Sequence, residues 1–523
     1  MPLTTPAPDV WSMLTNCMEM TPHAPAFIHG EHAISFAELS DSAARAAQGL
    51  ADLGVGPGDR VALWLPNVPA YPILYFACAR LGAIAVAVNT RYRAVEVADI
   101  VGRSGATVLA CAPGFRGIDF LSILGEIDPA ALDRLGAVVT VVDMPSIVPP
   151  AIERRRCVPF ERLLSRPPLG INHAGANAPC NIFTTSGTTS APKFVLHRQG
   201  AIATHSQQVA RTFGFDAADT LTLSIMPLCG VFGFNQTMAT LAAGRPCVLV
   251  ESYEIEDIAR LIERHRPTTM FGSDDMYARL LELVPGERPF PSIKWAGYAN
   301  FNAALADIAE RAETRGLSLV GLYGMSEVQA LYARQPLDAP LARRKLGGGV
   351  PVSPLAHARV QDGELECAGP SLMVGYYGDP PATQRALTAD GYIRTGDLAE
   401  ADGHGGFTFL SRMGDVLRLS GFLVNPLEIE THLQKLDAIE GCQTVAVARP
   451  DGVRAVAFVI VKQGATLDEA AAIAHCRQGL ANYKVPVRVL PIDDFPKTPS
   501  PNGFKIQRTK LREMAEAALQ RQS

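Results

Sequence analysis

Residues 183–193 read Phe-Thr-Thr-Ser-Gly-Thr-Thr-Ser-Ala-Pro-Lys and lie between two short apolar runs. Small side chains let backbone N–H groups approach phosphate oxygens, hydroxyls add further donors, and the terminal Lys193 supplies positive charge. The stretch is not a Walker A loop, because the GxxxxGK[ST] spacing is absent. A Ser/Thr-rich stretch is usually a solvated loop, so the residues alone leave both a solvated loop and a phosphate-binding loop open. The order of these residues is more specific than their composition.

Outward from this loop, short β-branched runs alternate with helical periods over the first four hundred residues. Val97, Ile100 and Val101 recur at helical spacing, and residues 106–111 follow as a short apolar run. Strands that alternate with helices of about three turns are typical of crossover units and parallel sheets. We therefore expect an α/β fold with a large N-terminal domain, residues 1–412, built on mainly parallel sheets flanked by helices. The same alternation recurs at residues 255–262 and 268–271.

The pattern changes after residue 412. Residues 444–448 and 454–461 are strand-like and flank the segment 450–452, Pro-Asp-Gly, which is favourable turn chemistry for a hairpin. Residues 467–480 and 511–519 read as helices. We expect a small, mobile α+β C-terminal domain, residues 413–523.

The composition excludes several classes of protein. The chain has 523 residues, of which 48% are hydrophobic and 19% charged, so it can bury a sizeable core and is not mainly disordered. The net charge of −5 gives no global attraction to nucleic acid or to an anionic membrane. Ten cysteines are scattered without a CxxC pair or a Cys/His cluster, as expected of buried, reduced thiols.

Residues 70–88 form an apolar stretch, but Arg80 and Gly82 divide it into a helix and a β-branched strand rather than a membrane span. The N-terminal residues lack a basic segment followed by an apolar one, so no secretory signal is apparent. We therefore expect a cytoplasmic enzyme without a transmembrane segment. The sequence leaves the oligomeric state open, and a homodimer is one assembly that we allow for.

The order of residues 183–193 resembles the signature loop of the adenylate-forming superfamily, which includes acyl-CoA synthetases, peptide-synthetase adenylation domains and luciferases. Further blocks follow in the family's order and cover nearly the whole chain. The block at residues 53–67 is interpreted as structural, a helix end and turn before a buried strand. The family pattern has glycine where this chain has Ser190 and Phe194, and the larger Phe194 bears on the loop's mobility.

The resemblance implies an ATP site. Residues 323–327, Tyr-Gly-Met-Ser-Glu, are similar to the family's YGxTE motif. An aromatic face can stack on adenine, glycine lets the chain turn closely, and a carboxylate suits Mg²⁺. By resemblance Tyr323 and Gly324 contact adenine, Ser326 bonds the phosphate region, and Glu327 holds Mg²⁺. The loop residues implied to bind the phosphates are Thr185, Ser186, Gly187, Thr188, Thr189 and Lys193, with Thr188 also a metal ligand and, like Glu327, a catalytic residue.

Two further residues complete the nucleotide site by resemblance. Asp397 lies in Thr-Gly-Asp-Leu, residues 395–398, and can accept two hydrogen bonds from the ribose hydroxyls. Arg412 resembles the family arginine that reaches the ribose. On the sequence alone, Asp397 could equally be a turn aspartate and Arg412 a surface arginine.

The segment after Arg412 resembles the hinge and opening of the family's C-terminal domain. The usual hinge residue is Asp or Lys, and here it is Gly414. Gly421 matches a glycine beside the path of the pantetheine arm of CoA. The family's catalytic lysine normally follows a glycine directly, but here Phe504 intervenes, so Lys505 is the best candidate. The less favoured alternatives are Lys497 and Lys510.

The acyl side is implied by residues 226–235, which align with a family segment that usually reads PLFHxxG. Cys229 and Gly230 replace its Phe and His, which leaves room for a bulkier or longer acid. A nucleophilic Cys229 has little support. The other residues assigned to this pocket are Phe234, Gly297, Tyr298 and Gly349.

These residues together predict an acyl-CoA synthetase that activates an apolar carboxylic acid, fatty or aromatic. It uses ATP, Mg²⁺ and coenzyme A, forms acyl-AMP with release of pyrophosphate, and then forms the thioester. One alternative is transfer to the pantetheine arm of a carrier protein. A second is a catalytically inactive homologue that binds a nucleotide or an acyl group. We expect small-molecule partners and no nucleic acid.

Overall fold

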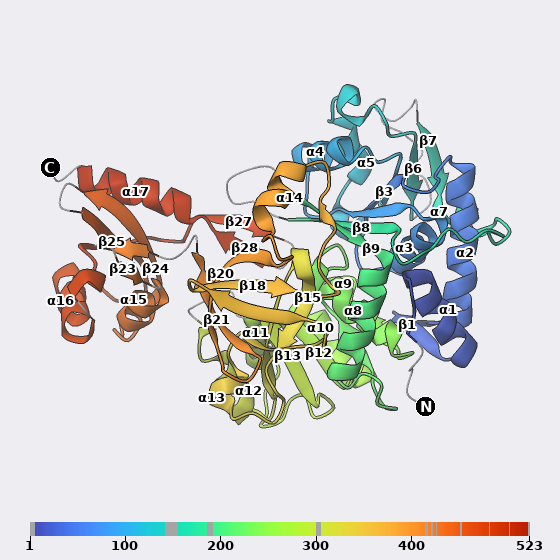
Figure 1. Cartoon of the computed structure of the whole chain (residues 1–523). Coiled ribbons are helices and arrows are strands. Elements are labelled where there is room, and N and C mark those ends of the chain that lie inside the picture. Colours follow the sequence, from blue (N-terminus) through green and yellow to red (C-terminus); the bar gives the residue numbers. More distant parts are fainter. Residues whose placement is uncertain are drawn as a thin grey trace.

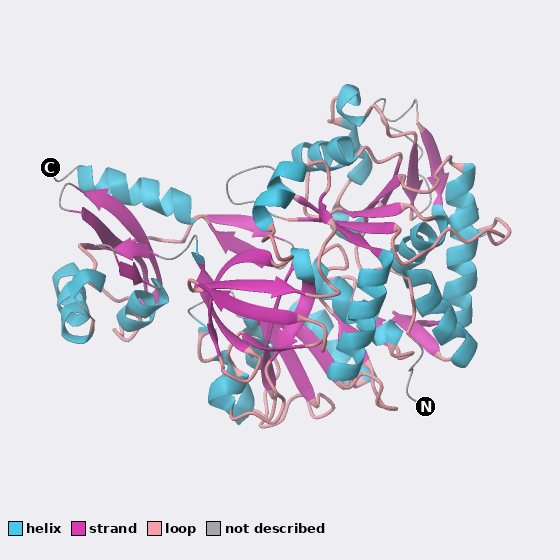
Figure 2. Ribbon diagram, viewed as in Figure 1, coloured by secondary structure: helices cyan, strands magenta, loops and turns pink. Residues whose placement is uncertain are grey.

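The computed structural model describes residues 6–141, 155–185, 192–299, 305–413, 417–419, 422–424, 426–449, 452–480, 482–500 and 503–520 (Figure 1). Up to residue 412 the described chain forms two large sheets flanked by helices, and smaller sheets follow (Figure 2). The predicted α/β class is confirmed.

The larger sheet has thirteen strands. Six of them are mutually parallel, and beyond the last of these, β14, the sheet continues with antiparallel strands. The spatial order of all thirteen strands is β17 (His357–Gln361), β18 (Glu364–Ala368), β20 (Ile393–Ala401), β21 (Phe407–Arg412), β16 (Gly348–Pro351), β15 (Gln329–Arg334), β14 (Leu319–Met325), β13 (Trp295–Ala299), β12 (Thr269–Ser273), β10 (Thr222–Ser224), β11 (Cys247–Leu249), β1 (Pro25–His29) and β2 (His32–Ser35).

The second sheet has eight strands, of which six are joined by parallel pairing; β9 pairs antiparallel with β8, and β19 pairs antiparallel with β9. Alternate residues of its central strand face opposite cores, as the two-residue period of a strand requires. Val61 packs with one hydrophobic cluster and Ala62 with another. The spatial order is β19 (Gly375–Tyr376), β9 (Phe194–Arg198), β8 (Pro179–Thr184), β4 (Ile84–Ala87), β3 (Arg60–Trp64), β5 (Val108–Cys111), β6 (Ala137–Thr140) and β7 (Arg156–Pro159).

Helices cover these sheets. Apolar side chains of both sheets share one core cluster with α1 (Val10–Met20), α2 (Phe36–Asp52), α3 (Ala70–Leu81), α8 (Gln199–Thr212) and α9 (Val231–Ala242). The other described α-helices before residue 413 are α4 (Ala94–Ser104), α5 (Phe120–Gly125), α7 (Phe160–Leu164), α10 (Ile255–His265), α11 (Asp274–Leu283), α12 (Ile308–Thr314), α13 (Leu341–Arg344) and α14 (Pro380–Ala386).

The predicted helix–strand pairs are confirmed. The apolar stretch at 70–88 divides into α3 and β4, and Gly82 ends the helix in the left-handed conformation, with φ of 69°. Residues 97, 100 and 101 are all buried on α4, and β5 follows. No helix among the described residues is long and apolar enough to cross a lipid bilayer.

After residue 412 the sheets are small. The predicted hairpin is β24 (Ile439–Arg449) with β25 (Gly452–Val461), and β26 (Arg488–Pro491) joins β25 in parallel. The predicted helices are α16 (Glu469–Gly479) and α17 (Arg508–Gln520). The remaining elements are α15 (Pro426–Leu433) and two short antiparallel pairs, β22 (Leu417–Leu419) with β23 (Phe422–Val424) and β27 (Lys497–Ser500) with β28 (Gly503–Ile506). Figure 1 draws the β27–β28 hairpin between the C-terminal helices and the large sheets.

Candidate active site

The predicted motifs converge because most of them follow the carboxyl ends of strands. Ligands of α/β sheets bind in the crevice outside these ends. β8 ends at Thr184, directly before the phosphate loop, and β14 ends at Met325, directly before Ser326 and Glu327. The first strand belongs to the eight-stranded sheet and the second to the thirteen-stranded sheet, so the candidate site lies where the two sheets meet.

The ends of the phosphate loop form the base of a hairpin. β8 and β9 are antiparallel, with Thr184 opposite Phe194, and the backbone N–H of Thr185 donates to the Lys193 carbonyl at 3.0 Å. Thr185 and Lys193, at the two ends of the loop, therefore lie side by side. Four predicted phosphate-binding residues lie outside the described residues: Ser186, Gly187, Thr188 and Thr189.

Phe194 occupies a place where the family pattern has glycine, and its ring is buried in the core of the eight-stranded sheet. The Arg103 guanidinium lies 4.2 Å from the ring centroid. Arg103 also donates to the Pro192 carbonyl at 2.7 Å and pairs with Asp99. The larger side chain thus anchors the C-terminal end of the loop from within the core.

Tyr323, Asp397 and Arg412 form one hydrogen-bonded group. The Tyr323 hydroxyl donates to Asp397 Oδ2 at 2.6 Å, and Arg412 Nε lies 3.1 Å from Asp397 Oδ1. Asp397 and Arg412 are opposite each other on β20 and β21, and Arg412 also donates to the Thr395 carbonyl at 3.0 Å. Burial, and then the negative Asp397, raise the pKa of Tyr323, which keeps its hydroxyl protonated as a donor.

Glu327 is held by a residue that has no assigned role in the sequence analysis. The Tyr376 hydroxyl donates to Glu327 Oε1 at 2.8 Å, and Glu327 is 7% exposed. The Lys193 ammonium lies 4.6 Å from the centroid of the Tyr376 ring. These contacts bring a phosphate-loop residue and the predicted metal ligand to the same tyrosine.

The donor set around Glu327 fits Mg²⁺. A carboxylate oxygen is a hard ligand of the kind that Mg²⁺ binds together with substrate phosphates. Within the part of the chain that the structure describes, Glu327 Oε2 accepts no hydrogen bond, so that oxygen keeps its lone pairs for a cation. The predicted second ligand, Thr188, lies outside the described residues.

A buried histidine fixes Ser326 from the other sheet. His197, on β9, is fully buried and lies 2.7 Å from the Ser326 carbonyl through Nε2, which must therefore carry the proton. Burial lowers the pKa of His197 to about 4. His205, on α8, holds the Ala330 carbonyl in the same way at 2.7 Å, and burial lowers its pKa to about 4. Both histidines are neutral donors at neutral pH.

We expect His205→Gln to flatten the pH dependence of stability. Below about pH 6.5 the unfolded chain binds a proton that folded His205 does not, so wild-type stability falls as pH drops toward 4. One such histidine accounts for a loss of about 2 kcal/mol between pH 7 and pH 5. Glutamine keeps a donor but does not titrate.

Urea unfolding of wild type and His205→Gln at both pH values measures this difference. His404→Gln, which replaces an exposed histidine in the β20–β21 turn, is the control. If the free energy of unfolding changes equally with pH in the wild type and in His205→Gln, protonation of His205 does not destabilise the folded chain.

Gly324 is required by the packing of the backbone around it. A Cβ on Gly324 would lie 2.6 Å from the Ala330 Cα and 2.8 Å from the Leu331 amide nitrogen, both on β15. These are backbone atoms, so they cannot move aside as a flexible side chain could.

On the acyl side, Asn67 holds the segment that carries Cys229. The Asn67 side chain accepts from the Leu228 N–H at 2.8 Å and donates to the Met226 carbonyl at 3.1 Å. Asn67 lies after β3 of the eight-stranded sheet and residues 226–228 lie after β10 of the other sheet. Gly230 is buried and precedes the first turn of α9.

The other residues assigned to the acyl pocket are buried in the structure. Phe234, on α9, packs edge-on against Tyr75 and Phe183 at centroid distances of 4.9 and 5.2 Å. A Cβ on Gly297 would lie 2.7 Å from the Leu322 and Phe271 side chains. These two positions therefore belong to packed core.

Two further pocket candidates are fixed by neighbouring backbone carbonyls. Tyr298 donates its hydroxyl to the Lys345 carbonyl, and burial raises its pKa. Gly349, on β16, has φ of 104°, and a Cβ there would overlap the Arg334 carbonyl of β15, so only glycine fits.

All ten cysteines are free, and nine are buried. Burial raises the pKa of Cys229 to about 12, so its thiol is not ionised at neutral pH. This agrees with the low weight that the sequence gives to a nucleophilic Cys229.

The candidate lysines lie on different elements. Lys505 is on β28, opposite Thr498 of β27, and only its backbone is described. Lys497 is paired with Asp494 at 2.6 Å, which lowers the pKa of that carboxyl. Lys510 is exposed on α17. Gly414 and Gly421 lie outside the described residues.

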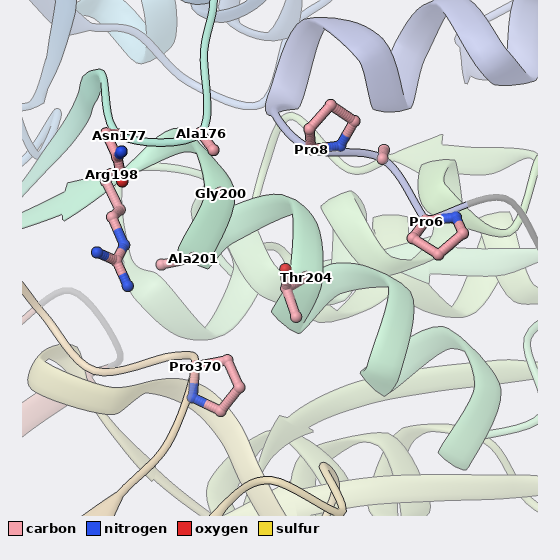
Figure 3. A pocket seen from close by; sticks show the side chains of 10 residues that line it. Pro6, Pro8, Ala176, Asn177, Arg198, Gly200, Ala201, Thr204 and Pro370 are labelled. Carbon is pink, nitrogen blue, oxygen red and sulfur yellow. The ribbon is translucent and has the colours of Figure 1, made fainter.

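A hollow of about 460 Å³ lies apart from these motifs (Figure 3). Asn177 and Arg198 are on one side of it and Pro6 and Pro8 on the other. None of the described residues that we assign to the nucleotide or acyl site lines it.

The structure adds residues that motif reading alone does not find. Tyr376, His197 and Asn67 each bridge the two sheets beside a predicted motif. Residues 373–376, Met-Val-Gly-Tyr, also resemble a family block, which marks the segment of Tyr376 but not its partner. Asn67 likewise ends the block at 53–67, which marks its segment but not its distant backbone partners, and His197 carries no such signal.

Comparison with known proteins assigns the family. Residues 14–377 match the AMP-binding enzyme model, and residues 428–501 match the AMP-binding enzyme C-terminal domain model. A 3-[(3aS,4S,7aS)-7a-methyl-1,5-dioxo-octahydro-1H-inden-4-yl]propanoyl:CoA ligase of Mycobacterium tuberculosis is 32% identical, covering 96% of this chain and 98% of that protein. Feruloyl-CoA synthase of Amycolatopsis sp is 30% identical over 92% and 94% of the two chains.

The fold is shared with a solved structure, ATP-bound MatB from Rhodopseudomonas palustris. Its TM-score is 0.82 and its identity 24%, and the match covers 98% of this chain and 99% of that one. The resemblance read from the motifs is confirmed. The chain belongs to the AMP-binding enzyme family, as an adenylate-forming enzyme of the acyl-CoA synthetase type.

Proposed function

We propose that this AMP-forming CoA ligase activates a ring-bearing, apolar carboxylic acid, with the roles below for its own residues. The proposed residue roles rest on one observation: two groups of contacting side chains lie at the junction of the sheets. One joins Tyr323, Asp397 and Arg412 through the Asp397 carboxylate. The other joins Lys193 and Glu327 through Tyr376.

In the first step a carboxylate oxygen of the acid attacks the α-phosphorus of ATP. The new O–P bond forms as the bond to pyrophosphate breaks, which gives acyl-AMP and pyrophosphate. Asp397 accepts from the ribose hydroxyls, Tyr323 contacts adenine, and Lys193 neutralises phosphate charge. Glu327 would hold Mg²⁺, which neutralises charge on the triphosphate when bound.

In the second step the CoA thiol attacks the acyl carbon, so that a C–S bond forms and the C–O bond to AMP breaks. The thiol proton leaves, and AMP is released with its phosphate ionised. We place the hinge for the accompanying rotation after Arg412, the last residue of β21, and the domain boundary at residues 412–413. Lys505 serves the first step and withdraws before the second.

The acid class rests on the relatives and on the pocket residues. The two relatives described above are named for acyl groups that contain rings, an indenyl propanoate and a ferulate. Cys229 and Gly230 are small where the family pattern has larger side chains, which leaves space for a ring. The surrounding residues assigned to the pocket are mostly apolar.

We expect ATP–pyrophosphate exchange with ring-bearing acids at a higher kcat/KM than with straight-chain fatty acids. A panel of both classes, assayed with the full chain, measures this. Preference for the straight chains would overturn the acid class. No exchange with any acid would instead favour the inactive, ligand-binding homologue.

The acceptor is tested with the best acid of that panel. Free CoA should yield thioester at a rate comparable to exchange, whereas thioester formation only on a carrier protein would support the alternative acceptor. A homodimer and a cytoplasmic location also stay predictions of ours, and light scattering of the purified chain checks the first.

A further inference from the structure

Tyr376 occupies a fixed place between the two sheets. It lies on β19, opposite Val195 of β9, so it belongs to the eight-stranded sheet. Its backbone N–H donates to Thr383 Oγ1 at 2.8 Å, which ties the strand to α14. The side chain is 7% exposed, so its orientation is determined by packing.

From this place the tyrosine contacts both charged groups of the phosphate site. Its hydroxyl donates to Glu327 Oε1 at 2.8 Å, and its ring lies 4.6 Å from Lys193 Nζ. The same segment holds Glu327 through the backbone, because the Met373 N–H donates to the Glu327 carbonyl at 2.8 Å. Glu327 follows β14 of the other sheet, so the hydroxyl bond crosses the junction.

The contacts have different electrostatic consequences. Donation from a neutral hydroxyl stabilises the ionised carboxylate and leaves one of its oxygens to face a cation. The ring attracts the ammonium through its face.

We propose that Tyr376 is a positioning residue that orients the metal-binding Glu327 and the phosphate-binding Lys193 together. The proposal rests on the function proposed above for those two residues. In this proposal the hydroxyl contributes to Mg²⁺ binding through Glu327, and the ring contributes to phosphate binding through Lys193. Substitutions that remove the hydroxyl alone or the whole ring can therefore separate the two contributions.

Tyr376→Phe removes the hydroxyl and keeps the ring. We expect the Mg²⁺-dependent gain in ATP affinity to fall by about tenfold, while ATP binding without Mg²⁺ is nearly unchanged. Isothermal titration of the full chain with ATP, with and without Mg²⁺, measures both quantities without any turnover. Tyr377→Phe is the matched control, since it deletes the same hydroxyl from the next residue, whose ring packs at the edge of the core.

Tyr376→Leu removes the ring as well. We expect it to weaken ATP binding both with and without Mg²⁺, because Lys193 also loses its contact. In a Glu327→Gln background, Tyr376→Phe should add no further loss of the Mg²⁺-dependent gain, since the carboxylate it orients is gone.

Three results would overturn the positioning role of Tyr376. Tyr376→Phe that matches wild type in the Mg²⁺-dependent gain overturns the proposal, and so does an equal loss with and without Mg²⁺. Additive losses in the Glu327→Gln background overturn it as well. A wild-type chain that shows no Mg²⁺-dependent gain contradicts the proposed metal role of Glu327 itself, which separates that failure from failure of the positioning role.

Discussion

Lys505→Ala is expected to slow acyl-adenylate formation by about 100- to 1,000-fold, because it removes a positive charge from the α-phosphate as charge develops there. Thioester formation from supplied acyl-adenylate should stay close to the wild-type rate. The reason is that, in the mechanism proposed above, the lysine serves only the first of two conformations and CoA reacts in the second. Pyrophosphate exchange measures the first step and thioester release from synthetic acyl-AMP measures the second.

The matched controls are Lys497→Ala and Lys510→Ala. Lys497 is already paired with Asp494, and Lys510 is exposed on α17, so both substitutions should leave exchange nearly unchanged. Undiminished exchange in Lys505→Ala together with a large loss in Lys497→Ala would move the role to Lys497. Equal losses in both steps for Lys505→Ala would mean that the substitution disturbs the domain rather than the chemistry.

Asp397→Asn is expected to raise the KM for ATP by about 10- to 100-fold, since two charge-assisted hydrogen bonds to ribose become neutral ones. The effect should depend on the ribose hydroxyls. Wild type should bind ATP much more tightly than 2′,3′-dideoxy-ATP, and the variant should discriminate far less. Titration of both nucleotides into both proteins measures this difference.

Tyr323→Phe supplies the control, because it removes the hydroxyl bonded to Asp397 and leaves the carboxylate in place. It should retain discrimination between the two nucleotides. If Asp397→Asn weakens both nucleotides equally, the aspartate acts by holding Tyr323 and Arg412 and not by contacting ribose.

The helix–strand alternation of the first half could be predicted from sequence because its periods are local. Residues 97, 100 and 101 repeat at helical spacing within one helix, and all three are buried on α4. The antiparallel extension of the larger sheet could not be predicted in the same way. β16 pairs with β21 and β18 pairs with β20, so these partners are set by tertiary contacts between distant short strands.

In the candidate site, too, some features could be predicted from local sequence and others depend on tertiary contacts. Tyr323, Glu327 and Asp397 are identified by motif order, and the structure brings Tyr323 to Asp397. The bond from Tyr376 to Glu327 could not be predicted, because it depends on β19 pairing with β9 across the junction. Gly324 shows the reverse case, in which a motif residue also has a packing reason that the sequence does not reveal.

The junction of the sheets has a thermodynamic consequence. Asn67, His197 and Tyr376 each bond across it, so a nucleotide bound there contacts groups that both sheets hold in place. Such a ligand binds the folded chain and not the unfolded one, and therefore adds stability by mass action, about 2.7 kcal/mol at a concentration of 100 times Kd. The melting temperature therefore rises with the occupancy of the nucleotide site. Acids that bind beside ATP can be ranked by the rise in melting temperature before any turnover is assayed.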